Sequence, residues 1–260
     1  MRILFIADAF AAAGRRIIEE RLPAVRRERE IDFVIANAEN IADGVGITSR
    51  LARRLLGGGV DVITLGNHAY RQREVYPYLD QEERILRPVN YPESAPGHGT
   101  CVVAAEDGTR VAVINLIGSL FLDATVSPFA VAERLVETAR KDAPVVVVDF
   151  HAEATSEKVA MGHLLAGRAT AVLGTHTHIQ TNDAHVLPGG TAYITDAGMT
   201  GPHDSVIGVR TDLVLRRFTT QLPIRFEPAE GDVRMEGAVI ECDGDGRATS
   251  IEAFRLLDNR

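Results

Sequence analysis

The stretch TAVLGTHTH, residues 170–178, joins an apolar run to two histidines that stand two positions apart. Alternate residues of a strand point to the same face, so His176 and His178 are expected to leave the end of this strand close together. Histidine is a common metal ligand, and the pair suits one metal ion or two neighbouring ions. The alternative is two ordinary polar residues in a loop, and the rest of the chain has to decide between these interpretations.

Apolar runs of strand-like composition alternate with amphipathic segments around this stretch. Strands are expected at 2–8, 31–40, 61–68, 110–118, 144–154, 170–178 and 191–198, and helices at 15–28, 48–59, 127–141 and 155–166. Thr48 fits an N-cap, Ser127 before Pro128 fits a helix start, and the helix at 155 opens with a pattern like a capping box. Continuous Val, Ile and Leu runs are typical of strands buried on both faces, so the pattern predicts a layered α/β fold.

The last forty residues have a different pattern. IRFEPAEG (224–231), RMEGAVIECD (234–243) and TSIEAFRLL (249–257) alternate apolar and polar positions, and a DGDGR turn separates the last two. Such alternation predicts antiparallel strands over about 218–260. Because no linker rich in Pro, Gly or Ser precedes them, residues 1–260 are expected to form a single domain.

Composition narrows the function classes. The chain has 260 residues, 45% of them hydrophobic and 25% charged, with a net charge of -8. This acidic balance argues against binding of duplex nucleic acid through its phosphates. Cys101 and Cys242 lack metal-binding spacing, Asp8 interrupts the apolar start of the chain, and no apolar run reaches the roughly 18 residues of a membrane span. A cytoplasmic protein without a membrane partner is expected, and a homo-oligomer is allowed.

Polar side chains follow the expected strands at the point where each strand ends. They are Asp8, Glu39, Asn40, Asn67, His68, His151, His176 and His178. In α/β sheets, ligands bind outside the carboxyl ends of the strands, so these residues are expected to converge. Turn formation would account for Asp and Asn but not for the three histidines His151, His176 and His178.

The chemistry of this set favours a pair of metal ions. Without His68 it holds two carboxylates, two amides and three imidazoles, which suits Mn, Fe, Zn or Co. Seven ligands are too many for one tetrahedral zinc, but they fit two ions about 3.5–4 Å apart with one bridging carboxylate. Two divalent ions exceed the charge of the two carboxylates, so the centre would attract a phosphate.

The ordered motifs resemble those of a known superfamily. Asp8, GNH (66–68), His151 and GTHTH (174–178) resemble the calcineurin-like metallophosphoesterases. NAEN (37–40), DFHAEATSEK (149–158) and AYITDAGMTGP (192–202) resemble more closely the bacterial YmdB-type phosphodiesterases, and LPIRFEPAEG (222–231) continues the likeness. The resemblance implies an α-β-β-α sandwich with mixed sheets and helices outside.

The resemblance also implies roles for the metal-binding residues. Asp8 and His178 would bind the first metal, and Asn40 would complete its coordination. Glu39 would bridge both metals. The second metal would be held by Asn67, His151 and His176. The metals would be two divalent or mixed-valence transition ions, with Fe or Mn first and Zn as an alternative. Residues that bind the rest of the substrate are not predicted.

The implied reaction is hydrolysis of a phosphodiester, with 2′,3′-cyclic nucleotides as expected small-molecule substrates. A metal-held hydroxide would attack phosphorus, and His68 would aid the leaving oxygen. Two alternatives stay open: a broad phosphomonoesterase, and a non-catalytic regulator that binds metal or nucleotide on the same scaffold. An amidohydrolase barrel is disfavoured, because its HxH motif comes early and its Asp late.

Two departures from the usual motifs matter. Phe10 stands where the superfamily has the histidine of DxH, which removes one nitrogen ligand of the first metal. Ala69 follows GNH in place of an acid, so the sequence does not indicate what orients His68. Asp183 and Asp196 are expected to be structural acids or to fix the ligand histidines from behind. His203 lies in a loop that could approach the substrate, while surface or packing roles are expected for His98, His163 and His185.

Overall fold

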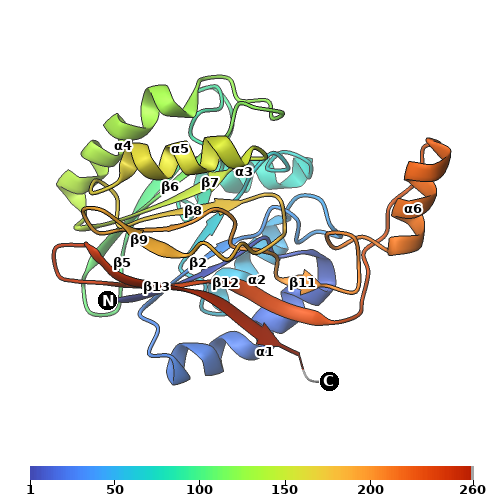
Figure 1. Cartoon of the computed structure of the whole chain (residues 1–260), viewed down its shortest axis with the longest axis horizontal. Coiled ribbons are helices and arrows are strands. Elements are labelled where there is room, and N and C mark those ends of the chain that lie inside the picture. The colour runs from blue at the N-terminus through green and yellow to red at the C-terminus, as the bar shows by residue number, and fades with distance from the viewer. Residues whose placement is uncertain (259–260) are drawn as a thin grey trace.

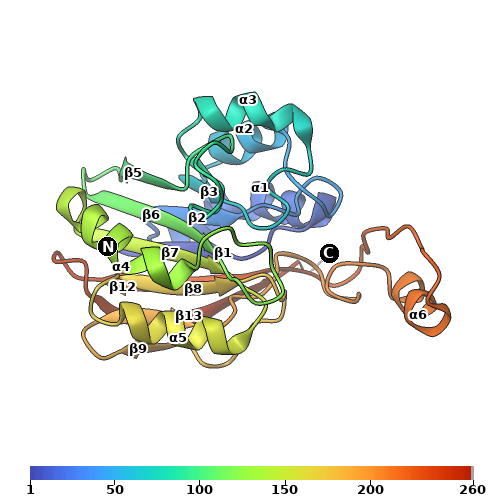
Figure 2. The same ribbon diagram turned by 90° about the horizontal axis from the view of Figure 1, so that it is seen from above.

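The computed structural model describes residues 1–258, which form two sheets packed face to face with helices on the outside (Figures 1 and 2). Within these residues the first sheet has seven strands, in the order β11 (Gly201–Pro202), β12 (Val233–Cys242), β1 (Arg2–Ile6), β2 (Phe33–Asn37), β3 (Val62–Thr64) and β4 (Ile85–Leu86), with β13 (Ala248–Leu257) beside β12. The second sheet has six, in the order β5 (Thr100–Ala104), β6 (Arg110–Ile117), β7 (Val145–His151), β8 (Ala171–Thr175), β10 (Thr191–Ile194) and β9 (His185–Leu187).

Both sheets are mixed. Strands β1 to β4 are parallel, and β12 runs antiparallel to β1. Strands β6, β7, β8 and β10 are parallel, with β5 and β9 antiparallel at the edges. The sandwich predicted from the motifs is therefore confirmed. In each sheet the carboxyl ends of neighbouring parallel strands meet at one edge, where side chains from different strands can converge.

Helices cover the outer faces. Helices α1 (Ala11–Glu28) and α2 (Ser49–Gly57) pack on the first sheet, near the short helices η1 (Arg73–Val75) and α3 (Tyr76–Gln81). Helices α4 (Pro128–Asp142) and α5 (Thr155–Leu165) pack on the second sheet. Helix α6 (Thr211–Thr220) projects away from the body (Figure 1). A third apolar layer, which includes Phe5 and Val147, fills the space between the sheets.

The predicted elements differ from the observed ones mainly at their ends. Strands β1, β2 and β3 are shorter than predicted. The polar residues expected at their ends lie in the loops after them and do not take part in strand pairing. Helix α1 begins at Ala11 rather than at residue 15. Thr48 caps α2 by accepting a hydrogen bond from the Leu51 amide, as predicted. Ser127 precedes α4 without a side-chain cap, and Ala154, not a capping-box residue, precedes α5.

The prediction for the C-terminal region is confirmed in part. Strands β12 and β13 form the predicted antiparallel pair. The segment 224–231 is not a strand, and residues up to 220 belong to α6. This segment alternates in sequence, but its only β-bridge within residues 1–258 is the one between Val209 and Pro228, so it does not join a sheet. No helix within residues 1–258 combines the length and apolar character that a membrane crossing requires.

Candidate metal centre

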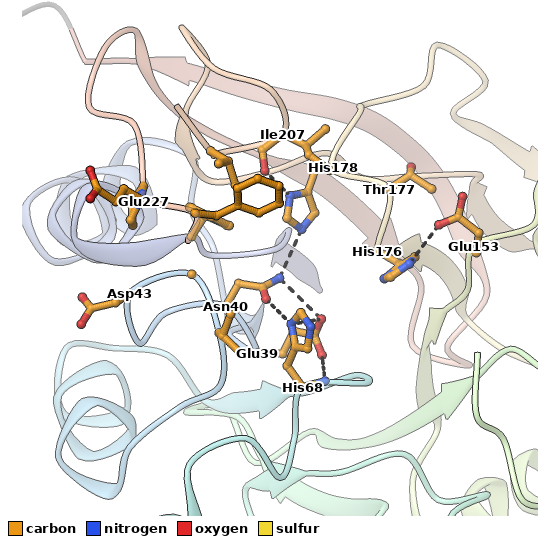
Figure 3. Close-up of a pocket in the computed structure, with 16 residues that line it drawn as sticks. Glu39, Asn40, Asp43, His68, Glu153, His176, Thr177, His178, Ile207 and Glu227 are labelled. Atoms are coloured by element: carbon orange, nitrogen blue, oxygen red, sulfur yellow. Dashed lines mark hydrogen bonds and ion pairs between the residues drawn. The ribbon is translucent and has the colours of Figure 1, made fainter. Parts of the chain in front are cut away.

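All eight predicted site residues lie at the edge where the two sheets present their carboxyl ends. Figure 3 shows Glu39, Asn40, His68, His176 and His178 of this set. Asp8, Glu39, Asn40, Asn67 and His68 come from loops after β1, β2 and β3 of the first sheet. His151 is the last residue of β7, and His176 and His178 follow β8, both in the second sheet. The site is therefore built across the sandwich, with ligands from both sides.

Four nitrogen and oxygen atoms meet around His151. Its Nε2 lies 3.0 Å from Asn67 Oδ1, 3.1 Å from His176 Nδ1 and 3.2 Å from Glu39 Oε1. Glu39, His151 and His176 each offer one ligand atom, and these atoms lie within 4.8 Å of one another. These are the residues assigned to the second metal, with Glu39 as the bridge. Their mixed O/N donor set suits a transition-metal ion.

Hydrogen bonds to the other ring nitrogens orient these two histidines. His151 Nδ1 lies 2.9 Å from Thr175 Oγ1, which donates to Asp149 Oδ1 at 2.7 Å. Since the Thr175 hydroxyl uses its hydrogen on Asp149, it must accept from His151 Nδ1–H. His176 Nε2 lies 3.0 Å from a Glu153 oxygen and donates to it. In the neutral form of both rings, His151 Nε2 and His176 Nδ1 therefore carry no hydrogen, and their lone pairs point into the cluster, where they can bind a metal ion.

Asp8 and His178, the two residues assigned to the first metal, lie close to each other. His178 Nδ1 donates to the Ile207 carbonyl at 3.0 Å, which leaves Nε2 facing Asp8 Oδ1 at 3.8 Å. Asp8 is fully buried, and its Oδ1 has no hydrogen-bond partner within residues 1–258. A buried carboxylate oxygen without a partner is costly, and a bound cation would satisfy it. The residues present therefore fit a metal ion.

Asn40 supplies the partner of His68 that the sequence did not indicate. Its Oδ1 lies 2.6 Å from His68 Nδ1, and its Nδ2 lies 3.2 Å from His178 Nε2. The His68 amide donates to Glu39 Oε2 at 2.7 Å. In this orientation the Asn40 side-chain oxygen pairs with His68 Nδ1. That oxygen can coordinate the first metal only if the side-chain amide flips.

The charges of the cluster also call for cations. Burial raises the pKa of Asp8. Burial would also raise the pKa of Glu39, but the attraction of the neighbouring His151 outweighs burial and lowers this pKa to about 2. Burial would lower the pKa of His151, yet Glu39 and Asp8 raise it to about 9. The two carboxylates thus attract positive charge, which a proton on His151 or a metal ion can supply.

A buried ion pair holds the loop that carries both ligand histidines. His176 and His178 have positive φ angles of 103° and 65°, a region that most residues avoid. Between them, the Thr177 amide and hydroxyl both donate to Asp196 Oδ2, at 3.1 and 2.7 Å. Lys158 Nζ donates to the same oxygen at 2.6 Å. Of the two acids expected to fix the histidines, Asp196 holds the loop between them, whereas Asp183 accepts hydrogen bonds from Thr181 and Thr195 instead. Lys158 was missed although it ends the quoted motif DFHAEATSEK.

Two further motif positions have structural explanations. A Cβ on Gly66 would lie 2.3 Å from the His151 ring, so the glycine of GNH lets the two strand ends approach each other. Phe10 packs its ring edge-on against His178, with centroids 5.8 Å apart. It also fills the space beside Gly44 and Gly208. Phe10 therefore replaces a nitrogen ligand with a packing contact behind His178.

The other polar residues considered in the sequence lie outside the cluster. His163 and His185 are exposed. His203 lies 3.1 Å from the Met199 carbonyl and does not line the pocket at the metal centre. The relay residues Thr175 and Asp149 were not predicted, although Thr175 lies within GTHTH and Asp149 begins DFHAEATSEK.

The two-sheet sandwich and this donor set define a phosphoesterase of the calcineurin-like superfamily, and comparison with known proteins agrees. A family model described as YmdB-like protein matches residues 4–254. The chain therefore belongs to the YmdB-like family, and its class of activity is hydrolysis of phosphate esters.

Its relatives span nearly the whole chain. It is 44% identical over 259 residues to a 2′,3′-cyclic-nucleotide 2′-phosphodiesterase of Bacillus subtilis (strain 168), covering 100% of this chain and 97% of that protein. It is 35% identical over 265 residues to a putative phosphatase/phosphodiesterase of Mycoplasma genitalium, covering 99% of this chain and 93% of that protein. The crystal structure of a hypothetical protein from Thermus thermophilus matches with a TM-score of 0.92 at 43% identity, covering 99% and 100%. A novel phosphatase from Mycoplasma pneumoniae matches with a TM-score of 0.91 at 33% identity, covering 99% and 93%.

Proposed function

We propose that this phosphoesterase hydrolyses 2′,3′-cyclic nucleotides with two transition-metal ions bound. The observation that carries the proposal is the group of donor atoms around His151 Nε2, beside the buried, unpartnered Asp8 Oδ1. The activity named for the Bacillus subtilis relative supports the substrate class. The donor set suits Mn, Fe, Zn or Co, and we expect Fe or Mn first, as the resemblance to YmdB-type phosphodiesterases implies, with Zn as the alternative.

The ligands divide between the two ions as the motifs imply. Asp8, Asn40 and His178 would hold the first ion and Glu39 would bridge, while the second would be held by Asn67, His151 and His176. When bound, the two ions would activate a water molecule and offset the charge of the phosphate.

His68 would act on the leaving group. Its Nδ1 is fixed by Asn40, so Nε2 is the nitrogen that remains for a substrate in the pocket that His68 lines. During hydrolysis the water oxygen forms a new bond to phosphorus, and the bond from phosphorus to one ribose oxygen breaks. That oxygen needs a proton. His68 with protons on both ring nitrogens would deliver one from Nε2 or stabilise the oxygen, and the proton that the attacking water releases would restore His68.

Two competing functions make different predictions. A broad phosphomonoesterase is favoured by the word phosphatase in the name of the Mycoplasma genitalium relative. A non-catalytic regulator on the same scaffold would bind metal or nucleotide without turnover. Monoester turnover faster than diester turnover would favour the first, and a metal-loaded protein without any turnover would favour the second.

The decisive test combines metal analysis with turnover. We would assay 2′,3′-cyclic AMP, bis(p-nitrophenyl) phosphate and p-nitrophenyl phosphate with the unaltered chain and three variants. His176→Ala should lose metal and activity, because it removes a ligand. His68→Ala should keep about two metals per chain and lose roughly 10²–10⁴ in rate. The matched control His163→Ala, at an exposed position, should change neither.

A further inference from the structure

The cleft in front of the metal centre has an apolar side. Its volume is about 490 Å³, and it reaches from His68, His176 and His178 to the segments around residues 45, 207 and 226 (Figure 3). We call six of its lining residues the apolar wall: Phe10, Val45, Ile207, Val209, Phe226 and Pro228. Ile207 is 48% exposed and Phe226 46%, although both are large and hydrophobic. Exposed apolar surface beside a reactive centre is typical of a ligand-binding site.

The same cleft has no cationic side chain. Of its lining residues within the described part of the chain, none is Lys or Arg, and four are acids: Glu39, Asp43, Glu153 and Glu227. Glu153 contacts His176, and Glu227 contacts Arg210 at 2.7 Å, but Arg210 itself does not line the cleft. Away from the metal ligands, a second phosphate would therefore meet carboxylates, and no Lys or Arg among the lining residues would compensate their charge.

The apolar wall is tied to the metal centre by backbone contacts. The Ile207 carbonyl accepts the hydrogen bond that orients His178. The bridge between Val209 and Pro228, and the hydrogen bond from the Arg210 amide to the Glu227 carbonyl, hold the Phe226 segment beside the Ile207 loop. A ring that packs on Ile207 and Phe226 would thus lie at a fixed place relative to a phosphate at the metal ligands.

We propose that this cleft selects a mononucleoside cyclic phosphate, with its single phosphate at the metal ligands and its base on the apolar wall. Ile207 and Phe226 bind the base, and the carboxylates of the cleft, Asp43 among them, disfavour substrates that carry a further phosphate. The inference rests on the proposed function and adds the substrate class: small cyclic mononucleotides rather than 5′-phosphorylated forms or the cyclic phosphate ends of RNA chains.

The test compares three substrates that share one reacting group. They are 2′,3′-cyclic AMP, glycerol 1,2-cyclic phosphate, which has no base, and 2′,3′-cyclic AMP with an added 5′-phosphate. Phe226→Ala should lower kcat/KM for 2′,3′-cyclic AMP about tenfold, mainly through KM, because stacking of a base on an aromatic ring is lost. Turnover of the glycerol substrate should stay within about twofold. The control Phe218→Ala, on α6 outside the cleft, should affect neither substrate.

A separate comparison tests whether the carboxylates of the cleft disfavour a further phosphate. The unaltered chain should prefer 2′,3′-cyclic AMP over its 5′-phosphorylated form by about tenfold at low salt, and Asp43→Asn or higher salt should narrow that preference. Equal turnover of both forms, or an equal effect of Phe226→Ala on the substrates with and without a base, would overturn the inference while the proposed function stands. Absence of turnover with every cyclic phosphate would instead overturn the proposed function and this inference with it.

Discussion

At the scale of single residues, Thr175 connects a ligand histidine to the acid that fixes it. His151 Nδ1 donates to the Thr175 hydroxyl, which donates to the buried Asp149. Thr175→Val keeps the shape but removes the hydroxyl, so the ring loses its fixed orientation. We expect metal affinity or activity to fall about 10- to 100-fold, as for other groups that orient metal ligands.

Metal titration with elemental analysis checks this prediction. The matched control is Thr138→Val on α4, where the hydroxyl bonds only to the Arg134 carbonyl of the same helix. Unchanged metal affinity and turnover in Thr175→Val would mean that the relay does not orient His151.

Lys158 is buried to the same degree as the acid that it contacts. Lys158 is 2% exposed and Asp196 1%, with 2.6 Å between Nζ and Oδ2. Lys158→Met would leave a buried carboxylate without its cation, and we expect the free energy of unfolding to fall by about 3–5 kcal/mol. Adding Asp196→Asn should recover part of that loss, since the side chain at 196 is then neutral.

Urea denaturation measures both variants, with exposed Lys141→Met as the control that should stay within about 0.5 kcal/mol. An unfolding free energy that does not change in Lys158→Met would refute the stabilising role of the pair.

At the scale of elements, Gly66 allows the loop after β3 to reach the end of β7. A Cβ at this position would lie 2.3 Å from His151 Nε2, and the ring is fully buried. Gly66→Ala must therefore displace the ring or the loop. Since a displacement near 1 Å can cost about 100-fold in rate, we expect a loss of that order together with the second metal ion.

Turnover and metal content of Gly66→Ala are compared with Gly57→Ala, where a Cβ would meet nothing within 4 Å. Normal metal content in Gly66→Ala would show that the loop adapts without moving the ligands.

The elements that could be predicted are those with a simple relation between sequence and burial. Strands β7 and β8 are buried along their whole length, so continuous apolar runs identified them. Of the ten residues of α6, only Val214 is buried, so no apolar stripe marked this helix. The convergence of the site residues was predictable because they follow or end buried strands. Thr175, Asp149 and the apolar wall were not, because their partners come from segments that only the fold brings together.

At the scale of the whole molecule, the proposed metal ligands come from both sheets. Asp8, Glu39 and Asn67 follow strands of the first sheet, while His151 ends β7 and His176 follows β8 in the second. Ions bound between them would stabilise the folded chain but not the unfolded one. At a free metal concentration of 100 times Kd the gain is about 2.7 kcal/mol. For a chain of this size that corresponds to a rise in Tm of about 5–10 °C.

Thermal unfolding with Mn²⁺ and with a chelator measures this gain, and His176→Ala should respond less because it lacks a ligand. Since ligands from both sheets share the ions, we expect one cooperative transition in both conditions, as the proposed single domain requires. Equal midpoints with metal and with chelator would contradict the binding of ions between the sheets. Two separate transitions, with metal shifting only one of them, would instead mean that the sheets unfold independently and that the site depends on one of them alone.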